Sequence, residues 1–410
     1  MNESHRELQD EGKDISAMRN LNILSFAAFV RMLGVGLVNL ILAIYALELV
    51  GDVFLSGIAV GAFSITQVVF QIPIAKLSDR IGRKNTLLIG MGIFATGTLL
   101  CGVSQTIYQL IIFRLIQGSG AYISVIQALL GDLFPSEKRG RAMGRYIAAM
   151  TVGYAVGLPL GGIFVDIPNY AFFLHFGVIL ISMALIYFFI NESPISRVKK
   201  QEVKINYRQE IFKNRLFLFT VLVDCLSIFV FASLLAYIAL FALSLGIEAS
   251  IFSIFMIPLV LLMTLGFFLG GKYSDQIGRS KMILIGFSVA GPLILVQSII
   301  TTPVQLVIIA GILVFGLGLA WPTLQALIID SVSEPCRATG TSVYNTFRYT
   351  SNALGPIIMA YIIGVYSPSP ENIGPGIRVS YLISGIIYII AFFLVLIFLR
   401  RFEKERHQVC

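Results

Sequence analysis

The sequence of 410 residues is poor in charge and rich in apolar residues: 13% are charged and 57% are hydrophobic. This composition is too apolar for a soluble domain of this size. Cysteine is also scarce, since the four Cys are scattered with no Cys-x-x-Cys pair, and we expect reduced thiols. No P-loop, Walker motif, nucleophile triad or metal-ligand cluster is visible. We therefore expect no cofactor and no metal site, and neither enzymatic activity nor ATP-driven transport is supported.

Long apolar segments make up most of the chain, and each is near or above the roughly 20 residues that a helix needs to cross a bilayer. Six segments precede a polar, basic stretch, and six follow it. The expected spans are residues 21–49, 54–75, 86–104, 106–131, 142–165 and 169–190, then 216–243, 249–271, 281–300, 303–329, 338–365 and 379–399. We therefore predict an all-α polytopic membrane protein with 12 transmembrane helices.

The basic residues are distributed unevenly between these spans. Lys and Arg fall in alternate connections and at both ends of the chain, whereas the other connections carry acidic residues and a single Arg378. The positive-inside rule then predicts a multi-pass protein of the plasma membrane with both termini in the cytoplasm. This arrangement explains the net charge of +8 without a nucleic-acid partner. The predicted parts are a cytoplasmic tail (1–20), a six-helix bundle (21–190), a cytoplasmic linker (191–215), a second six-helix bundle (216–399) and a second tail (400–410).

One short polar stretch occurs twice, at the same place in the two halves. The first copy is Ala75–Lys84 and the second is Gly271–Lys281, and both contain Asp, two residues and then Gly-Arg. Glycine permits a sharp turn, and the charges hold that turn at the water surface. The segment 132–139 likewise recurs as 330–337. Two copies in register predict a parallel internal repeat about an axis along the membrane normal.

On these motifs the sequence resembles transporters of the major facilitator superfamily over nearly its whole length. Asp79–Lys84 and its second copy resemble the superfamily loop signature, although its usual leading Gly is Ala75. Arg114–Ala121 resembles the helix 4 motif of proton-coupled members. Residues 153–162 resemble the helix 5 motif of twelve-helix drug/proton antiporters, with Pro159 one place late. The resemblance implies two six-helix bundles related by pseudo-twofold symmetry, which expose a central site to each side in turn.

The resemblance also implies that the repeated loop motif acts as a gate. It implies an ion pair between Arg83 and Asp132, and a contact of Asp79 with the N-terminal end of helix 11 in the other half. Several contacts of modest size can hold one face closed and still release it. The predicted gating residues are Asp79, Gly82, Arg83, Lys84, Asp132, Asp275, Gly278 and Arg279.

Glycines four residues apart in the fifth predicted helix form a strip that another helix can approach closely. Pro159 removes a backbone hydrogen bond from the same helix. We infer a pliable contact between the two halves at this strip, and ordinary small-residue packing is the alternative. The predicted hinge residues are Gly153, Gly157, Pro159, Gly161 and Gly162.

Charged residues inside the spans are the candidates for proton coupling, because each costs about 2.5–3.5 kcal/mol to insert. The clear acid among them is Asp224, and we predict that it binds the transported proton. Arg31 or Arg348 is its expected partner, which would shift its pKa. The alternative is a static Arg–Asp pair that holds two helices together.

Arg114 is the remaining coupling candidate, and the family resemblance implies a role in proton transfer or gating. Small residues at 118 and 121 follow it on the same expected helical face and leave room beside the guanidinium. An Arg does not lose its proton at ordinary pH, so it would act by perturbing a neighbour.

Substrate contacts are expected on the helices that line the central cavity in this superfamily. A mostly apolar cavity with a few polar groups suits lipophilic compounds, including cations. Interhelix hydrogen bonds and core aromatic packing are the alternative roles for the same residues. The cavity candidates are Asn39, Tyr122, Phe231, Trp321 and Gln325.

The sequence therefore predicts a secondary active transporter that exports small hydrophobic or drug-like compounds in exchange for protons. It would work in the lipid bilayer as a monomer, with the small-molecule substrate and protons as its partners. One alternative is a proton symporter or passive carrier of a small metabolite with the same fold. Another is a transporter-like membrane sensor.

Overall fold

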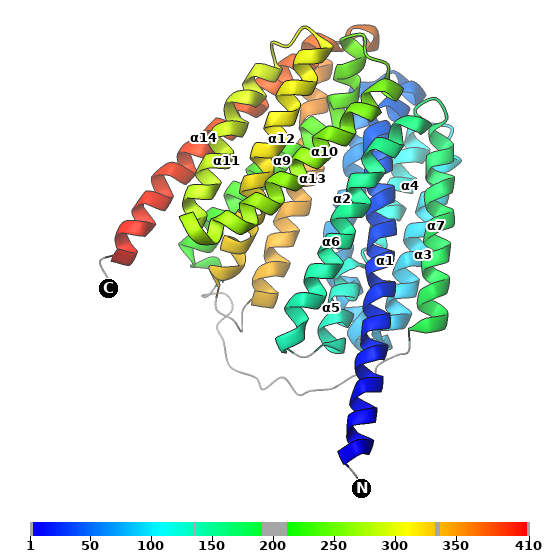
Figure 1. Cartoon of the computed structure of the whole chain (residues 1–410). Helices are drawn as coiled ribbons and strands as arrows, with labels where there is room; N and C mark the ends of the chain where they lie inside the picture. Colours follow the sequence, from blue (N-terminus) through cyan, green and yellow to red (C-terminus); the bar gives the residue numbers. More distant parts are fainter. Residues whose placement is uncertain (1–2, 135, 191–210, 333–336, 408–410) are drawn as a thin grey trace. The chain divides into compact units, whose positions relative to one another are not determined.

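The computed structural model describes residues 3–134, 136–190, 211–332 and 337–407. Helices account for nearly all of these residues, and no strand occurs among them (Figure 1). The helices divide into two compact units. Unit 1 comprises Met1–Ile41 and Ile65–Lys199, and unit 2 comprises Leu42–Ser64 and Lys200–Cys410.

Unit 1 holds most of α1 and the second part of α2. Within it, α3 packs against both α4 and α7. The helices in chain order are α1 (Glu3–Val50), α2 (Val53–Ile81), α3 (Arg83–Gly102), α4 (Ile107–Ser119), α5 (Ile123–Leu133), α6 (Ser136–Gly161), the short 3-10 helix η1 (Gly162–Phe164) and α7 (Pro168–Phe189).

Unit 2 holds the remaining helices together with the end of α1 and the start of α2. In this unit α12 packs against α10 and α11, and α9 packs against α13 and α14. The helices are α9 (Arg215–Ser244), α10 (Ala249–Ile277), α11 (Arg279–Gln297), α12 (Pro303–Asp330), α13 (Arg337–Tyr366), the 3-10 helix η3 (Pro370–Asn372) and α14 (Gly374–His407).

The start of α2 belongs to unit 2 because it packs tightly on α13. A Cβ on Gly57 would lie 2.3 Å from the Cβ of Ala360, and Asn352 Nδ2 donates a hydrogen bond to Ser64 Oγ (2.8 Å). The predicted bundle limits of 21–190 and 216–399 stay a prediction. The predicted linker lies outside the described residues over 191–210.

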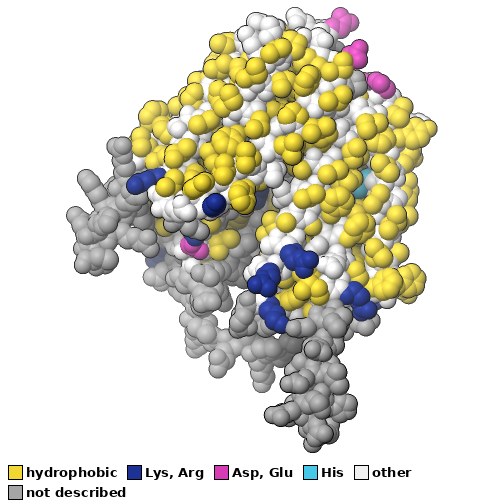
Figure 2. All heavy atoms as spheres, in the orientation of Figure 1, with side chains coloured by type: hydrophobic (Ala, Val, Ile, Leu, Met, Phe, Trp, Pro, Cys, Tyr) yellow, Lys and Arg dark blue, Asp and Glu magenta, His cyan; other side chains and the backbone are white. Residues whose placement is uncertain are grey.

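Eleven helical segments of the described residues are long and apolar enough to cross a membrane, with α4 and α5 counted together as Ile107–Leu133. The remaining long helix, α13, is not among them, because Thr346, Arg348 and Asn352 make its first half polar. On the face drawn in Figure 2, hydrophobic side chains cover most of the described surface, and Lys, Arg, Asp and Glu are few. This is the surface expected of a chain whose helices meet lipid.

The repeated polar motifs are helical, which differs from the loops that the sequence predicts. Helix α2 continues to Ile81 and α10 to Ile277, so each motif forms the last turns of a helix. Single glycines with positive φ, Gly82 (99°) and Gly278 (95°), separate these helices from α3 and α11. Glycine adopts this conformation without steric cost, so the predicted sharp turn needs only one residue.

Two other boundaries also differ from the prediction. Helix α1 begins at Glu3, so the expected tail of residues 1–20 continues directly into the first span. The fourth span is broken into α4 and α5 around Gly120, where a Cβ would lie 2.4 Å from the carbonyl oxygen of Gly90. The predicted break before Pro303 is confirmed, since Thr302 and Gln305 form a capping box at the start of α12.

Candidate functional site

Asp224 is the only Asp or Glu among the described residues that is buried, with 0% of its side chain exposed. It lies on α9, and its electrostatic partners are the Arg348 guanidinium and the Tyr344 hydroxyl of α13. Arg348 Nη1 donates a hydrogen bond to Tyr344 Oη (3.2 Å), so the two side chains act as one polar group. Within the described chain, neither Asp224 oxygen meets the geometry of a hydrogen bond. The carboxylate therefore interacts electrostatically with the Arg348 cation but forms no hydrogen bond with it.

The packing of α9 on α13 brings these groups together. A Cβ on Gly355 of α13 would lie 2.4 Å from the carbonyl oxygen of Phe229, so only glycine allows the two helices to approach this closely. The start of α9 is fixed by Asn214, whose side chain accepts from the Phe217 N–H and donates to the Ser331 carbonyl oxygen (2.6 Å). Of the two partners proposed for Asp224, the structure places Arg348 beside it.

A chain of buried polar groups lies near Asp224 in unit 2. The Trp321 indole on α12 donates through Nε1 to Ser227 Oγ on α9 (3.1 Å). Ser227 Oγ also shares a hydrogen bond with Tyr388 Oη of α14 (3.1 Å). Phe231 packs edge-to-face on the Trp321 ring with 4.5 Å between centroids, and Phe267 stacks on it at 6.3 Å. The structure thus brings together two of the predicted cavity residues, Phe231 and Trp321.

Arg31 is held in unit 1 by aromatic rings. Its guanidinium carbon lies 4.8 Å from the centroid of the Phe94 ring and 4.5 Å from that of Tyr122, and 2% of the residue is exposed. Cations are attracted to the faces of such rings, most strongly where water is excluded. Tyr122, which the sequence predicts in the cavity, packs against the Arg31 guanidinium in this structure.

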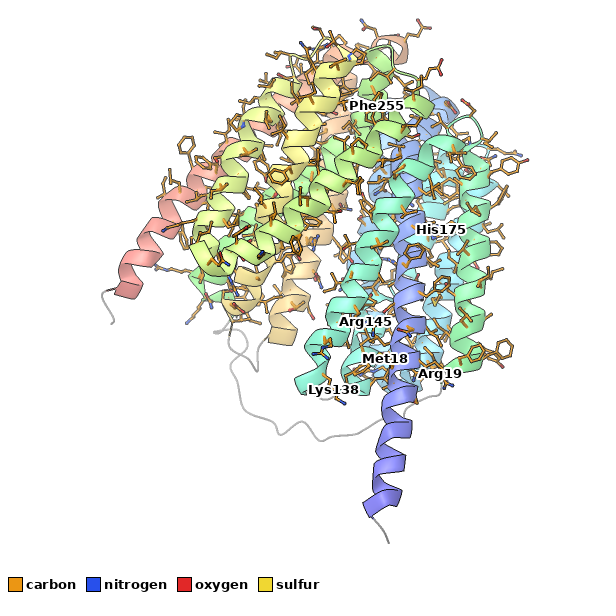
Figure 3. The ribbon with its side chains drawn as sticks, in the orientation of Figure 1. Met18, Arg19, Lys138, Arg145, His175 and Phe255 are labelled. Atoms are coloured by element: carbon orange, nitrogen blue, oxygen red, sulfur yellow. The ribbon has the colours of Figure 1, made fainter. Side chains whose placement is uncertain are left out.

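His175 on α7 belongs to the same group of side chains. Its ring packs edge-to-face on Phe94 (5.5 Å between centroids) and covers Gly34 of α1, where a Cβ would lie 2.0 Å from the imidazole. Figure 3 shows His175 part-way along α7, away from the end of unit 1 where Met18, Arg19, Lys138 and Arg145 lie. No sequence pattern singles out this residue, because the three His are far apart in the chain.

Arg114 is buried on α4 and points to an amide. Its Nη1 donates to Gln117 Oε1 (2.6 Å), and Gln117 Nε2 donates to Thr98 Oγ1 on α3 (2.8 Å). The prediction that Ala121 shares a helical face with Arg114 is wrong, because α4 ends at Ser119. The break leaves Arg114 within a network between α3 and α4.

The Arg83–Asp132 ion pair that the resemblance implies is present in unit 1. Arg83 Nε lies 3.0 Å from Asp132 Oδ2, and its Nη1 lies 2.6 Å from both Asp79 Oδ1 and Ser78 Oγ. Lys84 Nζ donates to the Tyr187 carbonyl oxygen of α7 (2.8 Å). The predicted contact of Asp79 with the other half stays a prediction.

The second copy of the motif repeats this pairing in unit 2. Arg279 forms an ion pair with Asp330, at the positions that correspond to Arg83 and Asp132. The side chain of Asp275, which corresponds to Asp79, lies outside the described residues. The repeated sequence motif therefore forms the same Arg–Asp ion pair in each unit.

The glycine strip of α6 packs on α1 within unit 1. A Cβ on Gly153, Gly157 or Gly161 would lie 2.1–2.5 Å from the carbonyl oxygens of Phe29, Leu33 and Leu37 respectively. The inference that this strip forms a contact between the two halves is therefore wrong for these three positions, because α1 contributes residues of the same unit. Pro159 lies inside α6, and Gly162 begins η1.

The remaining cavity candidates lie apart from the Trp321 cluster. Asn39 Nδ2 of α1 donates to Tyr154 Oη of α6 (3.3 Å), which is the interhelix hydrogen bond given above as the alternative role. Gln325 is half-buried one helical turn after Trp321 on α12. A cavity role for these residues stays a prediction.

A family model described as the Major Facilitator Superfamily matches residues 24–356 of the chain, and a further match covers residues 260–409. The chain belongs to the Major Facilitator Superfamily. It is therefore a multi-pass membrane transporter, and its all-α fold of long apolar helices is that of the superfamily.

The chain is similar in sequence to several bacterial membrane transport proteins. The inner membrane transport protein YajR of Escherichia coli (strain K12) is 26% identical over 343 residues, which are 82% of this chain and 75% of YajR. The multidrug resistance protein MdtG of Salmonella typhimurium is 28% identical over 303 residues, 71% of this chain and 74% of MdtG. An uncharacterized transporter of Buchnera aphidicola is 38% identical over 199 residues, but the chain spans only about half of it (49%).

Solved structures of other superfamily transporters share the fold. A bacterial homologue of the human lysosomal transporter Spinster, in an inward-facing and unoccupied conformation, aligns over 94% of this chain and 98% of its own with a TM-score of 0.82 and 17% identity. A D-xylose-proton symporter aligns over 92% and 97% with a TM-score of 0.74 and 17% identity. The superfamily fold thus carries transporters of different substrates.

Several residues of the candidate sites were missed in the sequence. Tyr344 precedes Arg348 by one helical turn, and Ser227 follows Asp224 by three residues, so helical spacing was a usable signal for both. Tyr388 and His175 carry no such signal, because only the tertiary packing of α14 and α7 brings them to their partners.

Proposed function

We propose that this transporter exports small hydrophobic compounds in exchange for protons by alternating access, with Asp224 as the proton-binding group. The observation that carries the proposal is a fully buried carboxylate beside Arg348 and Tyr344. A coupling site needs a group that gains and loses a proton at ordinary pH. An aspartate meets this need, whereas Arg31 and Arg114 keep their protons.

The energy available from protons is sufficient for this task. One proton that crosses a potential of about 100 mV releases roughly 2.3 kcal/mol. At 1.4 kcal/mol for each tenfold change, this supports about a fiftyfold gradient of a neutral compound.

The change in charge at Asp224 supplies a physical link to movement. When the carboxylate is charged, the Arg348 cation stabilises it and α9 is drawn to α13. When the carboxyl group is protonated, this attraction is lost and the cation on α13 must find another partner or water. The relative stability of two arrangements of these helices then depends on the proton.

The aromatic cluster around Trp321 supports an apolar substrate. Together with Phe231 and Phe267, the Trp321 indole forms an aromatic surface. The indole N–H adds no polar group to this surface, because Nε1 already donates to Ser227. Such a surface recognises flat or lipophilic groups by stacking. MdtG, a relative named as a multidrug resistance protein, supports the same substrate class.

The two motif ion pairs are proposed as gates of modest strength. Arg83 and Asp132 are 26% and 47% exposed, and Arg279 and Asp330 are 31% and 48% exposed. Pairs this accessible to water contribute about 0–1 kcal/mol each, so they can open and close within a transport cycle. Arg19, Lys138 and Arg145 lie together at one end of unit 1 (Figure 3), which supports a cytoplasmic location of that end.

The decisive experiment compares Asp224→Asn with the matched variant Asp52→Asn in everted membrane vesicles. Asp52 is exposed and caps α2 by accepting from the Leu55 N–H (3.0 Å), a role that Asn can keep. With a lipophilic cation as the test compound, the wild type and Asp52→Asn should dissipate an imposed pH gradient, and Asp224→Asn should not. Unchanged dissipation by Asp224→Asn would remove the proposal.

The direction of proton movement separates the export function from its rivals. A D-xylose-proton symporter shares this fold, so a symport cycle could use the same carboxylate. A symporter would move protons with the compound, and a passive carrier would move the compound with no proton flux. A membrane sensor would move nothing in liposomes under any gradient.

A further inference from the structure

One of the two hydrogen bonds at Ser227 has a direction that the surrounding chain does not fix. The indole Nε1 of Trp321 can only donate, so Ser227 Oγ must accept from it. In the second bond, between Ser227 Oγ and Tyr388 Oη, either hydroxyl can be the donor. Two arrangements of the same atoms are therefore available, which differ in whether the Tyr388 hydrogen points toward Ser227 or away from it.

The charge on Asp224 acts on this choice. Asp224 and Ser227 are three residues apart on α9, so they lie on the same side of the helix. Asp224 also interacts electrostatically with the Tyr388 hydroxyl. A negative carboxylate attracts the hydrogen of a nearby hydroxyl, and a neutral carboxyl group does so much less. Since the Tyr388 hydroxyl is the one that interacts with Asp224, the charge favours the arrangement in which Tyr388 turns its hydrogen toward the carboxylate and Ser227 donates to Tyr388.

Asp224 is the group in this region that ordinary pH can titrate. The groups that face it are Arg348 and Tyr344 of α13, Tyr388 of α14 and, on α9 itself, Cys225. Helices α12 and α10, which also pack against α9, present Trp321 and Phe267, and neither of these titrates. Arginine stays charged, and Tyr and Cys change charge only at alkaline pH in the absence of special activation.

We propose that Ser227 and Tyr388 are positioning residues that transmit the protonation of Asp224 to the Trp321 indole and so set the affinity for aromatic substrates. When Asp224 is charged, Ser227 gives its hydrogen to Tyr388 and accepts from Trp321 alone. When Asp224 is protonated, Tyr388 gives its hydrogen to Ser227, which then accepts from both Tyr388 and Trp321. The changed bond to Nε1 shifts the indole between Phe231 and Phe267. This inference rests on the proposed role of Asp224 as the proton-binding group.

The single Trp of the chain makes this link directly measurable, because all indole fluorescence comes from Trp321. The experiment titrates the full-length purified protein in detergent from about pH 5 to about pH 9 without substrate or gradient, and follows the indole emission. The wild type should show a pH-dependent change in emission wavelength or intensity. Asp224→Asn should abolish it, and Ser227→Ala and Tyr388→Phe should abolish or strongly reduce it.

Two matched variants on α14 control for the loss of a buried hydroxyl. Tyr381 lies two helical turns before Tyr388 and is 1% exposed, and Ser384 is 0% exposed. The structure shows no hydrogen bond for either hydroxyl among the described residues. Tyr381→Phe and Ser384→Ala should therefore keep the wild-type titration. Tyr388→Phe keeps the ring that stacks on Phe287 (4.6 Å between centroids), so it should fold even where Ser227→Ala does not.

Each other result overturns the inference in a distinct way. A transition that Asp224→Asn abolishes but Ser227→Ala and Tyr388→Phe retain would remove the network and leave Asp224 as the titrating group. A transition that persists in Asp224→Asn, or its absence from the wild type, would show that Trp321 does not respond to this carboxylate. A transition lost equally in the Tyr381 and Ser384 variants would indicate a general packing effect. Because no transport is measured, all of these results are independent of the vesicle experiment on export.

Discussion

The two units bury their charges in different ways. In unit 1, Arg31 lies between two aromatic rings and Arg114 donates to an amide. In unit 2, Asp224 lies beside Arg348 and Tyr344. Rings and amides support a charge that never changes, whereas a carboxylate beside a cation can exist in two charge states. In the proposed mechanism, unit 1 therefore supplies a permanent positive charge and unit 2 supplies the group that responds to protons.

The framework around these charges is nevertheless the same in both units. Arg83 pairs with Asp132 in unit 1 as Arg279 pairs with Asp330 in unit 2. Glycines of α6 press on α1, and Gly355 of α13 presses on α9 in the corresponding way. The repeat thus preserved the contacts that build each unit, while the buried charges diverged.

The largest expected effect comes from removing the cation of unit 2. Arg348→Gln leaves the charged form of Asp224 uncompensated, at a cost of about 3–5 kcal/mol unless the carboxyl group keeps its proton. In either case the proton cycle stops, and substrate-driven proton flux in vesicles should be lost. Arg348→Lys keeps the charge and should retain a substantial part of the flux. Equal loss in both variants would mean that the shape of the guanidinium, and not its charge, matters in unit 2.

The sequence predicted those features that depend on local pattern or on the internal repeat. The Asp-x-x-Gly-Arg motif predicted the turns at Gly82 and Gly278, and its family resemblance implied the Arg83–Asp132 pair. The strip of glycines in α6 predicted a close helix contact but not its partner, because periodicity does not say which helix is the neighbour. Tyr388 and His175 depend wholly on tertiary packing, so their roles were not readable from the chain.

The second prediction tests whether the glycine strips build each unit or move one against the other. Gly157→Val would place its Cβ 2.1 Å from the carbonyl oxygen of Leu33. Gly355→Val would place its Cβ 2.4 Å from the carbonyl oxygen of Phe229. Overpacking of this kind costs about 1–3 kcal/mol, and more where backbone is struck. Both variants should lower the thermal unfolding midpoint of the purified protein. Gly144→Val is the control, since its Cβ meets nothing within 4 Å on the same helix as Gly157. A stable Gly157→Val protein that has lost only transport would restore the hinge interpretation.

A smaller effect is expected when Lys replaces the arginine of unit 1. Arg31 presents a flat guanidinium to Phe94 and Tyr122, and the compact ammonium of Lys does not stack on two rings in this way. Arg31→Lys should cost about 0.5–2 kcal/mol of stability, measured by thermal unfolding in detergent. Arg145→Lys, at an exposed position of the same unit, should cost almost nothing. If Arg31→Lys keeps the full stability of the wild type, the contrast between a stacked and a paired cation disappears.

The smallest effects should come from the two motif ion pairs, and they should be alike. The exposures of Arg83 and Asp132 (26% and 47%) nearly match those of Arg279 and Asp330 (31% and 48%). Double-mutant cycles built from Arg→Gln and Asp→Asn should therefore give coupling energies below about 1 kcal/mol for each pair. Both energies should fall further at high salt, because the Debye length is then only a few ångströms, about 3 Å at 1 M. A large, salt-insensitive coupling in one pair alone would mean that the two units differ in their framework as well as in their buried charges.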